Sequence, residues 1–91
     1  MDMNEIMRQA QQMQQKMSQV QNELAGRTVT ASVGGGMVSV ILNGKNELLS
    51  VQIDKEVINH EDREMLQDLI VSAVNEGLKK AQDMAQAEMR K

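Results

Sequence analysis

The sequence of 91 residues contains no cysteine, no proline and no aromatic residue. Without cysteine, a disulfide framework and thiolate metal or redox chemistry are excluded. Without Phe, Tyr or Trp, the core has to come from Val, Leu, Ile, Ala and nine Met, and unpaired bases would find no ring to stack on. A chain this short buries a low fraction of its surface, so we expect one domain that gains stability by association.

Long apolar runs and an excess of positive charge are also missing. No segment approaches the roughly 18 apolar residues of a membrane span, and the Gln-rich N-terminus has no apolar signal-peptide centre. Ten Lys and Arg against thirteen Asp and Glu give a net charge of −3. There is thus no overall basic field, which counts against a strong nucleic-acid binder. We expect a soluble, cytoplasmic protein.

Apolar residues recur at steps of three and four through the first two dozen positions. They are Met3, Ile6, Ala10, Met13, Met17, Val20 and Leu24. This a/d spacing predicts a helix over residues 3–25 with a narrow apolar seam among Gln and Asn. At about 33 Å, it is longer than the rest of the chain readily covers. It either packs on its own domain or, as we favour, packs on a second copy through Met13, Met17, Val20 and Leu24.

From Arg27 the apolar period changes from about 3.6 to 2, which predicts three strands over residues 27–33, 37–43 and 47–53. Glycines 34–36 and the Asn43-Gly44 pair predict the two turns of an antiparallel meander. One face should lie under a second helix; it carries Val29, Ala31, Val33, Val38, Val40, Leu42, Leu49, Val51 and Ile53. The other face is mostly small and polar, with Met37, Ile41 and Leu48 as apolar exceptions. These three are either ordinary surface residues or part of a dimer contact.

A second long helix is predicted over residues 60–89, with Asn59 as its N-cap and acidic residues in its first turn. Its apolar stripe is wide up to Leu78, enough to cover a sheet face. The fold class is therefore α+β, in the order α-β-β-β-α, as one domain over residues 1–91 with the three-stranded meander between two long helices.

No residue pattern indicates an active site or a cofactor. A strand follows the triple glycine, whereas a phosphate loop needs a helix there, so a hairpin turn is the better interpretation. His60, the only imidazole, lacks the further ligands of a metal site and fits a capping region. The acidic run over residues 54–68 fits a solvated helix start better than a cation site. We expect a protein that is not an enzyme and needs no metal, cofactor or small-molecule substrate.

Binding remains as the function. A polar helix that offers amides and a few cations can meet phosphates without a strong field, and a dimer doubles each contact. The candidate phosphate contacts are Arg8, Lys16, Arg27, Lys79, Lys80, Arg90 and Lys91.

Residues 8–17, from Arg8 to Met17, resemble the first helix of the YbaB/EbfC family of bacterial nucleoid-associated proteins. The likeness continues through residues 35–40, Asn43-Gly44, Ile53-Asp54, residues 64–70 and residues 73–75, in order and over nearly the whole chain. One departure is Lys55, where the family often has proline. The resemblance implies a cytoplasmic homodimer of tweezer-like outline that binds duplex DNA at the nucleoid. It carries over no catalytic motif and no set of DNA-contacting positions.

The leading hypothesis is therefore a homodimeric nucleoid-associated protein that binds duplex DNA mainly through phosphates and organises the nucleoid or regulates genes. The alternative is an adaptor that binds other proteins through its Gln- and Met-rich helix, since Met surfaces adapt to varied partners.

Overall fold

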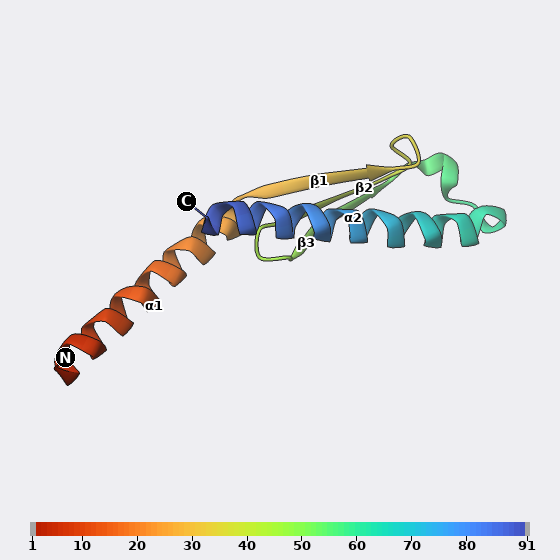
Figure 1. Cartoon of the computed structure of the whole chain (residues 1–91). Helices are drawn as coiled ribbons and strands as arrows, with labels where there is room; N and C mark the ends of the chain where they lie inside the picture. Colours follow the sequence, from red (N-terminus) through yellow and green to blue (C-terminus); the bar gives the residue numbers. More distant parts are fainter. Residues whose placement is uncertain (1, 91) are drawn as a thin grey trace.

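The computed structural model describes residues 2–90 and has the predicted α-β-β-β-α order (Figure 1). The elements are α1 (Met3–Gly26), β1 (Thr28–Val33), β2 (Val38–Asn43), β3 (Leu48–Ile53), the short 3₁₀ turns η1 (Lys55–Val57) and η2 (His60–Asp62), and α2 (Arg63–Met89). The strands form one antiparallel sheet in the order β1-β2-β3. The prediction of an α+β fold with a three-stranded meander between two long helices is confirmed.

The core lies between α2 and the first two strands. Leu42, Val38 and Val40 of β2 are fully buried. Above them α2 presents Ala73, Gly77 and Ala81, which recur at steps of four along one face of the helix. These small side chains let the helix backbone come close to β2, because a Cβ on Gly77 would collide with Leu42 and lie 3.1 Å from Val40 Cγ2. The core therefore depends on a close helix–sheet approach rather than on large side chains.

The expectation that the whole apolar face lies under α2 is wrong for β3. Leu49 and Val51 remain 54% and 40% exposed, whereas Ala31 and Val40 are fully buried. A helix about 10 Å wide covers about two strands that lie about 4.8 Å apart. Because α2 packs over β1 and β2, the third strand stays uncovered.

Leu48 does not share the face predicted for it. A register shift between Ile41 and Leu42 pairs Leu48 with the buried Leu42, while Ile41 pairs with Ser50. Opposed residues of an antiparallel pair point to the same face, and a bulge changes the alternation. Leu48 is thereby separated from Met37 and Ile41, so these three residues do not form one patch.

The two turns form where the sequence predicts them. Gly34, Gly35 and Gly36 all have positive φ, from 63° to 94°, a region that glycine enters without steric cost. In the second turn the side-chain oxygen of the buried Asn43 accepts hydrogen bonds from the backbone N–H groups of Lys45 and Glu47. Strand β2 directly follows the glycine turn, as expected for a hairpin rather than a phosphate loop.

Helix α2 begins slightly later than predicted. The side chain of Asn59 accepts a hydrogen bond from the N–H of Asp62, at 2.9 Å, and so caps the 3₁₀ turn η2. The α-helix itself then starts at Arg63. The predicted cap is correct, but it acts on a tighter turn that precedes the helix.

The molecule is elongated because α1 projects from the α2–sheet layer as an arm (Figure 1). Its radius of gyration is 19.0 Å, whereas a compact chain of this length would have about 12 Å. In the arm only Leu24 is buried and Val20 is half-buried. The alternative in which α1 packs wholly on its own domain is therefore wrong.

The close approach at Gly77 gives a first prediction. Gly77→Ala should lower the urea midpoint of unfolding, with a loss of about 1–3 kcal/mol typical of overpacking a core. Circular dichroism during urea titration measures it. Gly26→Ala is the matched control, because nothing lies within 4 Å of its added Cβ. Equal midpoints for the two variants would show that α2 can move away from β2 without cost.

Candidate nucleic-acid interface

The arm forms a helix along its full length because local signals agree with its sequence pattern. At its start, Asp2 accepts a hydrogen bond from the N–H of Asn4, and Glu5 lies in the first turn, where the helix dipole favours an acid. Neither glycine nor proline interrupts the helix before Gly26. At its end the N–H of Arg27 donates to the carbonyl of Leu24. The helical form of the arm thus depends mainly on local signals in its own sequence and little on the body of the molecule, that is, the layer formed by α2 and the sheet.

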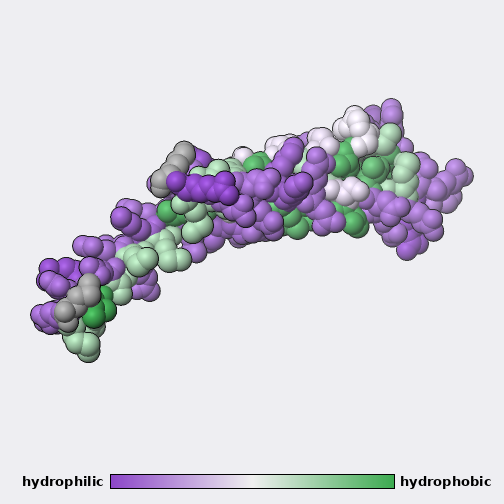
Figure 2. Space-filling model, viewed as in Figure 1, coloured by the Kyte–Doolittle hydropathy of each residue, from purple (hydrophilic) through white to green (hydrophobic). Residues whose placement is uncertain are grey.

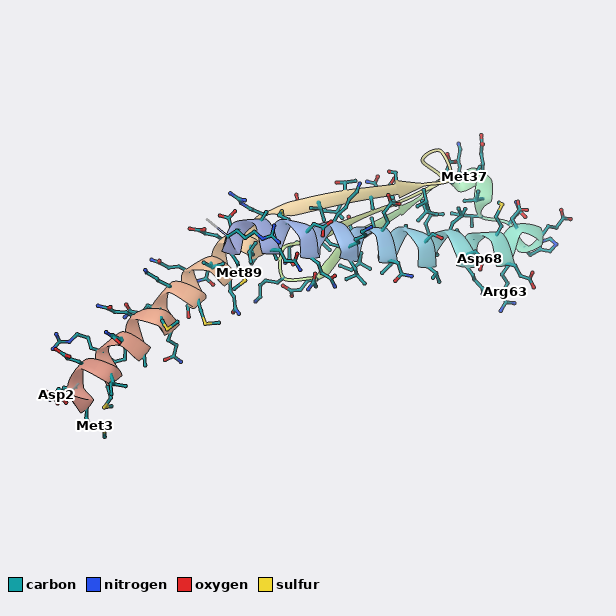
Figure 3. All side chains as sticks on the ribbon, viewed as in Figure 1. Asp2, Met3, Met37, Arg63, Asp68 and Met89 are labelled. Carbon is teal, nitrogen blue, oxygen red and sulfur yellow. The ribbon has the colours of Figure 1, made fainter. Side chains whose placement is uncertain are left out.

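The base of the arm is fixed at few points. The N–H of Gly44 donates to the carbonyl of Leu24 at 2.8 Å, and the Leu24 side chain is buried against the β2–β3 turn. Arg27 Nη1 donates to Glu88 Oε2 at 2.6 Å and so connects the end of α1 to the end of α2. An apolar groove of about 370 Å³ lies beside this junction, between the arm, the turn and the last turn of α2, where Figure 3 labels Met89.

The two basic residues predicted on α1 lie on the arm itself. Arg8 and Lys16 are both exposed, and among residues 2–90 no ion pair involves either side chain. Eight residues separate them, so they lie about 12 Å apart along the helix axis. Their side chains are therefore available to a partner that lies along the arm.

Arg27 and Lys80 have intramolecular contacts. Arg27 is paired with Glu88, as described, and Lys80 Nζ donates to the backbone carbonyl of Thr30 in β1, at 3.1 Å. Both lie along β1, on the body rather than on the free part of the arm. A phosphate would have to compete with these contacts, which makes the two residues poorer candidates than Arg8 and Lys16.

The remaining candidates lie on α2. Lys79 and Arg90 are exposed, but Glu76 lies one turn before Lys79 and Asp83 one turn after it. The outer face of α2 thus mixes both signs of charge. Lys91 lies outside the residues that the structure describes.

Acidic residues are concentrated at one end of the molecule, which the net charge of the whole chain does not reveal. Residues 54–68 contain six of the thirteen acidic residues and only two of the ten basic ones. This segment lies at the end opposite the arm, where Figure 3 labels Arg63 and Asp68. The rest of the chain is left with seven acidic and eight basic residues. The acidic segment over residues 54–68 thus lies far from Arg8 and Lys16, whose own helix carries Glu5 and Glu23 as its acidic residues.

The predicted dimer residues are distributed over two regions. Met13, Met17, Val20 and Leu24 follow one side of the arm, where Figure 2 shows a pale green stripe along otherwise purple surface. Met37 lies at the far end of the sheet (Figure 3). Because these two regions lie far apart, a single contact surface between two copies would not include both of them.

Neither a metal site nor a membrane-spanning helix is found in the part of the chain that the structure describes. His60 is exposed in η2, and no three His, Cys, Asp or Glu side chains among residues 2–90 are grouped so as to hold a metal ion. No helix within the described range is long and apolar enough to cross a membrane.

The arrangement is that of a small α+β protein with a projecting polar helix that carries cations. The YbaB/EbfC DNA-binding family matches residues 1–91, and the chain belongs to this family. It is 58% identical to a nucleoid-associated protein of Syntrophobacter fumaroxidans over 93% of this chain and 77% of that one. A nucleoid-associated protein of Pelotomaculum thermopropionicum is 53% identical, over 97% and 84%.

A solved structure has the same fold. The uncharacterized protein HP0035 from Helicobacter pylori matches with a TM-score of 0.86 and 33% identity, over 96% of this chain and 91% of that one. The family that the sequence resembles is confirmed.

The attachment of the arm can be tested at Gly44. In Gly44→Ala the added methyl would lie 2.8 Å from the Cβ, the Cδ2 and the carbonyl oxygen of Leu24, so the hydrogen bond from the Gly44 N–H should break. We expect faster hydrogen exchange at the amides of Gly44 and Arg27 and a lower melting temperature. Lys45→Ala, an exposed change in the same turn, should alter neither. Protection that persists in Gly44→Ala would place the attachment elsewhere.

Proposed function

We propose that this chain binds duplex DNA as a homodimer, mainly through phosphate contacts, and takes part in nucleoid organisation or gene regulation. One observation carries the proposal: a projecting helix presents Arg8 and Lys16, which form no ion pair within residues 2–90, in a chain of a DNA-binding family. The acidic segment over residues 54–68 lies at the other end of the molecule, so its charges add little repulsion of phosphate near the arm. Relatives named nucleoid-associated proteins support the same role.

Phosphate contacts fit the chemistry of the arm. Each cation that neutralises a phosphate releases condensed counterions, so affinity falls steeply with salt. Arg8 and Lys16 supply few such contacts per chain, and two copies double the number. We therefore expect modest affinity that depends strongly on ionic strength. Arg27 and Lys80 contribute less, because each already has a partner in the structure.

Self-association is supported by the surface that one chain leaves exposed. The chain exposes 7016 Å², whereas a compact monomer of 10.2 kDa would expose about 5,300 Å². The excess is larger than the roughly 800 Å² that each partner buries in a standard interface. Part of it is the apolar seam of the arm, where Met13 and Met17 are 70% and 56% exposed. A second copy that packs on this seam would remove it from water.

DNA binding can be tested by charge reversal on the arm. Arg8→Glu with Lys16→Glu should weaken binding to a random-sequence duplex by roughly tenfold or more and should flatten its salt dependence. Fluorescence anisotropy in a salt series measures both quantities. Lys55→Glu with Arg63→Glu makes the same change of charge at the distant acidic end and should have a much smaller effect.

The outcomes separate the two functions considered. Equal losses in both variants would mean that only total charge matters and that the arm is not the site. If the unmodified protein binds no duplex even at low salt, the adaptor function explains the chain better than DNA binding does. The exposed Met seam would then be the surface that contacts other proteins.

The dimer can be tested independently of DNA. Met17→Asp with Val20→Asp should shift the mass measured by light scattering from that of two chains towards 10.2 kDa, because the charged side chains would enter the seam between copies. Met17 is exposed within one chain, so a loss of folding from that change is not expected. A dimer that survives both substitutions would place the interface elsewhere, with the uncovered Leu49 and Val51 of β3 as the next candidates.

A further inference from the structure

A second stripe runs along the arm, on the side roughly opposite the apolar seam. Its members follow one another at steps of four and three: Asn4, Arg8, Gln11, Gln15, Ser18 and Asn22. At 100° per residue they lie within about 80° of one another around the helix axis. All six are exposed. One helix thus has two narrow stripes of opposite character.

The composition of this polar stripe is unusual for a solvated helix face. Such faces commonly alternate acidic and basic side chains. Here amides dominate, one side chain is a cation and none is an acid. The two acidic residues of the helix interior, Glu5 and Glu23, lie off the stripe, within about 20° of Lys16 around the axis. The stripe therefore presents no acid of its own to an anionic partner, although Glu5 lies one turn before Arg8 beside it.

The amides of the stripe are also free to bind. Among the described residues, no side-chain hydrogen bond uses Gln11, Gln15 or Asn22. The side chains around the middle of the stripe form a shallow hollow of about 460 Å³ lined only by amides and one hydroxyl: Gln11, Gln14, Gln15, Ser18 and Gln19. Each amide offers a donor and an acceptor together.

This chemistry matches one edge of one base. Gln and Asn donate to N7 and accept from N6 of adenine in a bidentate pair, in the major groove of duplex DNA. That groove is about 12 Å wide and admits an α-helix. The arm stands clear of the body along most of its length (Figure 3), so the groove walls would meet no other part of the same chain there.

We propose that the polar stripe of α1 lies in the major groove and reads adenine-containing base pairs, with Gln11 and Gln15 as the specificity-determining residues and Arg8 on the neighbouring phosphate. This inference rests on the proposed DNA binding and adds sequence preference to it. Because the stripe is roughly opposite the seam, pairing of two copies through the seam would leave it exposed.

The experiment selects bound duplexes from a pool with a randomised central segment, at a salt concentration where binding is incomplete. The unmodified protein should enrich sequences with adenine at fixed positions. Gln11→Ala with Gln15→Ala should still bind the pool, with reduced affinity, but should lose the enrichment, by roughly 5-fold to 100-fold for each bidentate contact removed. The control Gln9→Ala with Gln21→Ala removes two amides off the stripe and should keep the enrichment.

A second pair of variants changes the preference instead of removing it. Gln15→Arg should move the preferred base at one position from adenine to guanine, because Arg makes the bidentate contact to O6 and N7 of guanine. Gln9→Arg adds the same charge off the stripe and should raise affinity without changing the enriched sequence. A change of base with Gln15→Arg alone supports the proposal.

Three results would overturn it. They are binding by the unmodified protein without any enriched sequence, an enriched sequence that the stripe variants leave unchanged, and a change of base caused equally by Gln9→Arg. In each case the pool is still bound, so DNA binding itself stands. Failure to bind any member of the pool at low salt would overturn the proposed function as well.

Discussion

The width of helix α2 limits how much of the sheet can be buried, and most other features of the molecule follow from this limit. One helix covers two strands, and α2 covers β1 and β2 through a contact so close that Gly77 has no room for a methyl group beside Leu42. Among the described residues no further element covers β3, because α1 projects away from the sheet. Apolar side chains are consequently exposed on β3 and along the arm. The exposed surface that supports association arises directly from this shortage of covering elements.

The same arrangement separates two tasks along the chain. The buried residues lie in the α2–sheet layer, and the polar and basic groups proposed to meet DNA lie on a helix that contributes almost nothing to that core. Substitutions on the free part of the arm therefore test binding with little cost in folding. Charge follows the same division, since residues 54–68 hold much of the acidic content at the end away from Arg8 and Lys16.

Periodicity in the sequence was enough to predict the elements, because the change from steps of three and four to steps of two is sharp at Arg27. It was not enough to predict which strands α2 covers, since Val40 and Val51 have the same alternation and only helix placement makes one buried and the other exposed. The bulge that pairs Leu48 with Leu42 leaves no local sign in the sequence, because neighbouring leucines fit either register.

The candidate site was predictable in type but not in detail. Basic residues can be listed from a sequence. The ion pair between Arg27 and Glu88, however, joins residues 61 positions apart, and only the folded structure reveals it. The alternation of Asn4, Arg8, Gln11 and Gln15 was available in the sequence as a period of three and four. It becomes informative only when the arm is seen to be uncovered on that side.

The contact of Lys80 with Thr30 has a consequence for how far association can extend. The N–H of Gly44 donates to the carbonyl of Arg27, so the backbone groups of Arg27 point towards β2. In an antiparallel pair this direction alternates along the strand. The backbone N–H and carbonyl of Thr30, three residues later, therefore point to the outer edge of the sheet. Lys80 occupies that acceptor, so the β1 edge is a poor template for another strand. No such contact is present on the outer edge of β3 among the described residues, so a second copy would pair more readily there, and a pair joined at β3 would leave only the two hindered β1 edges for further growth.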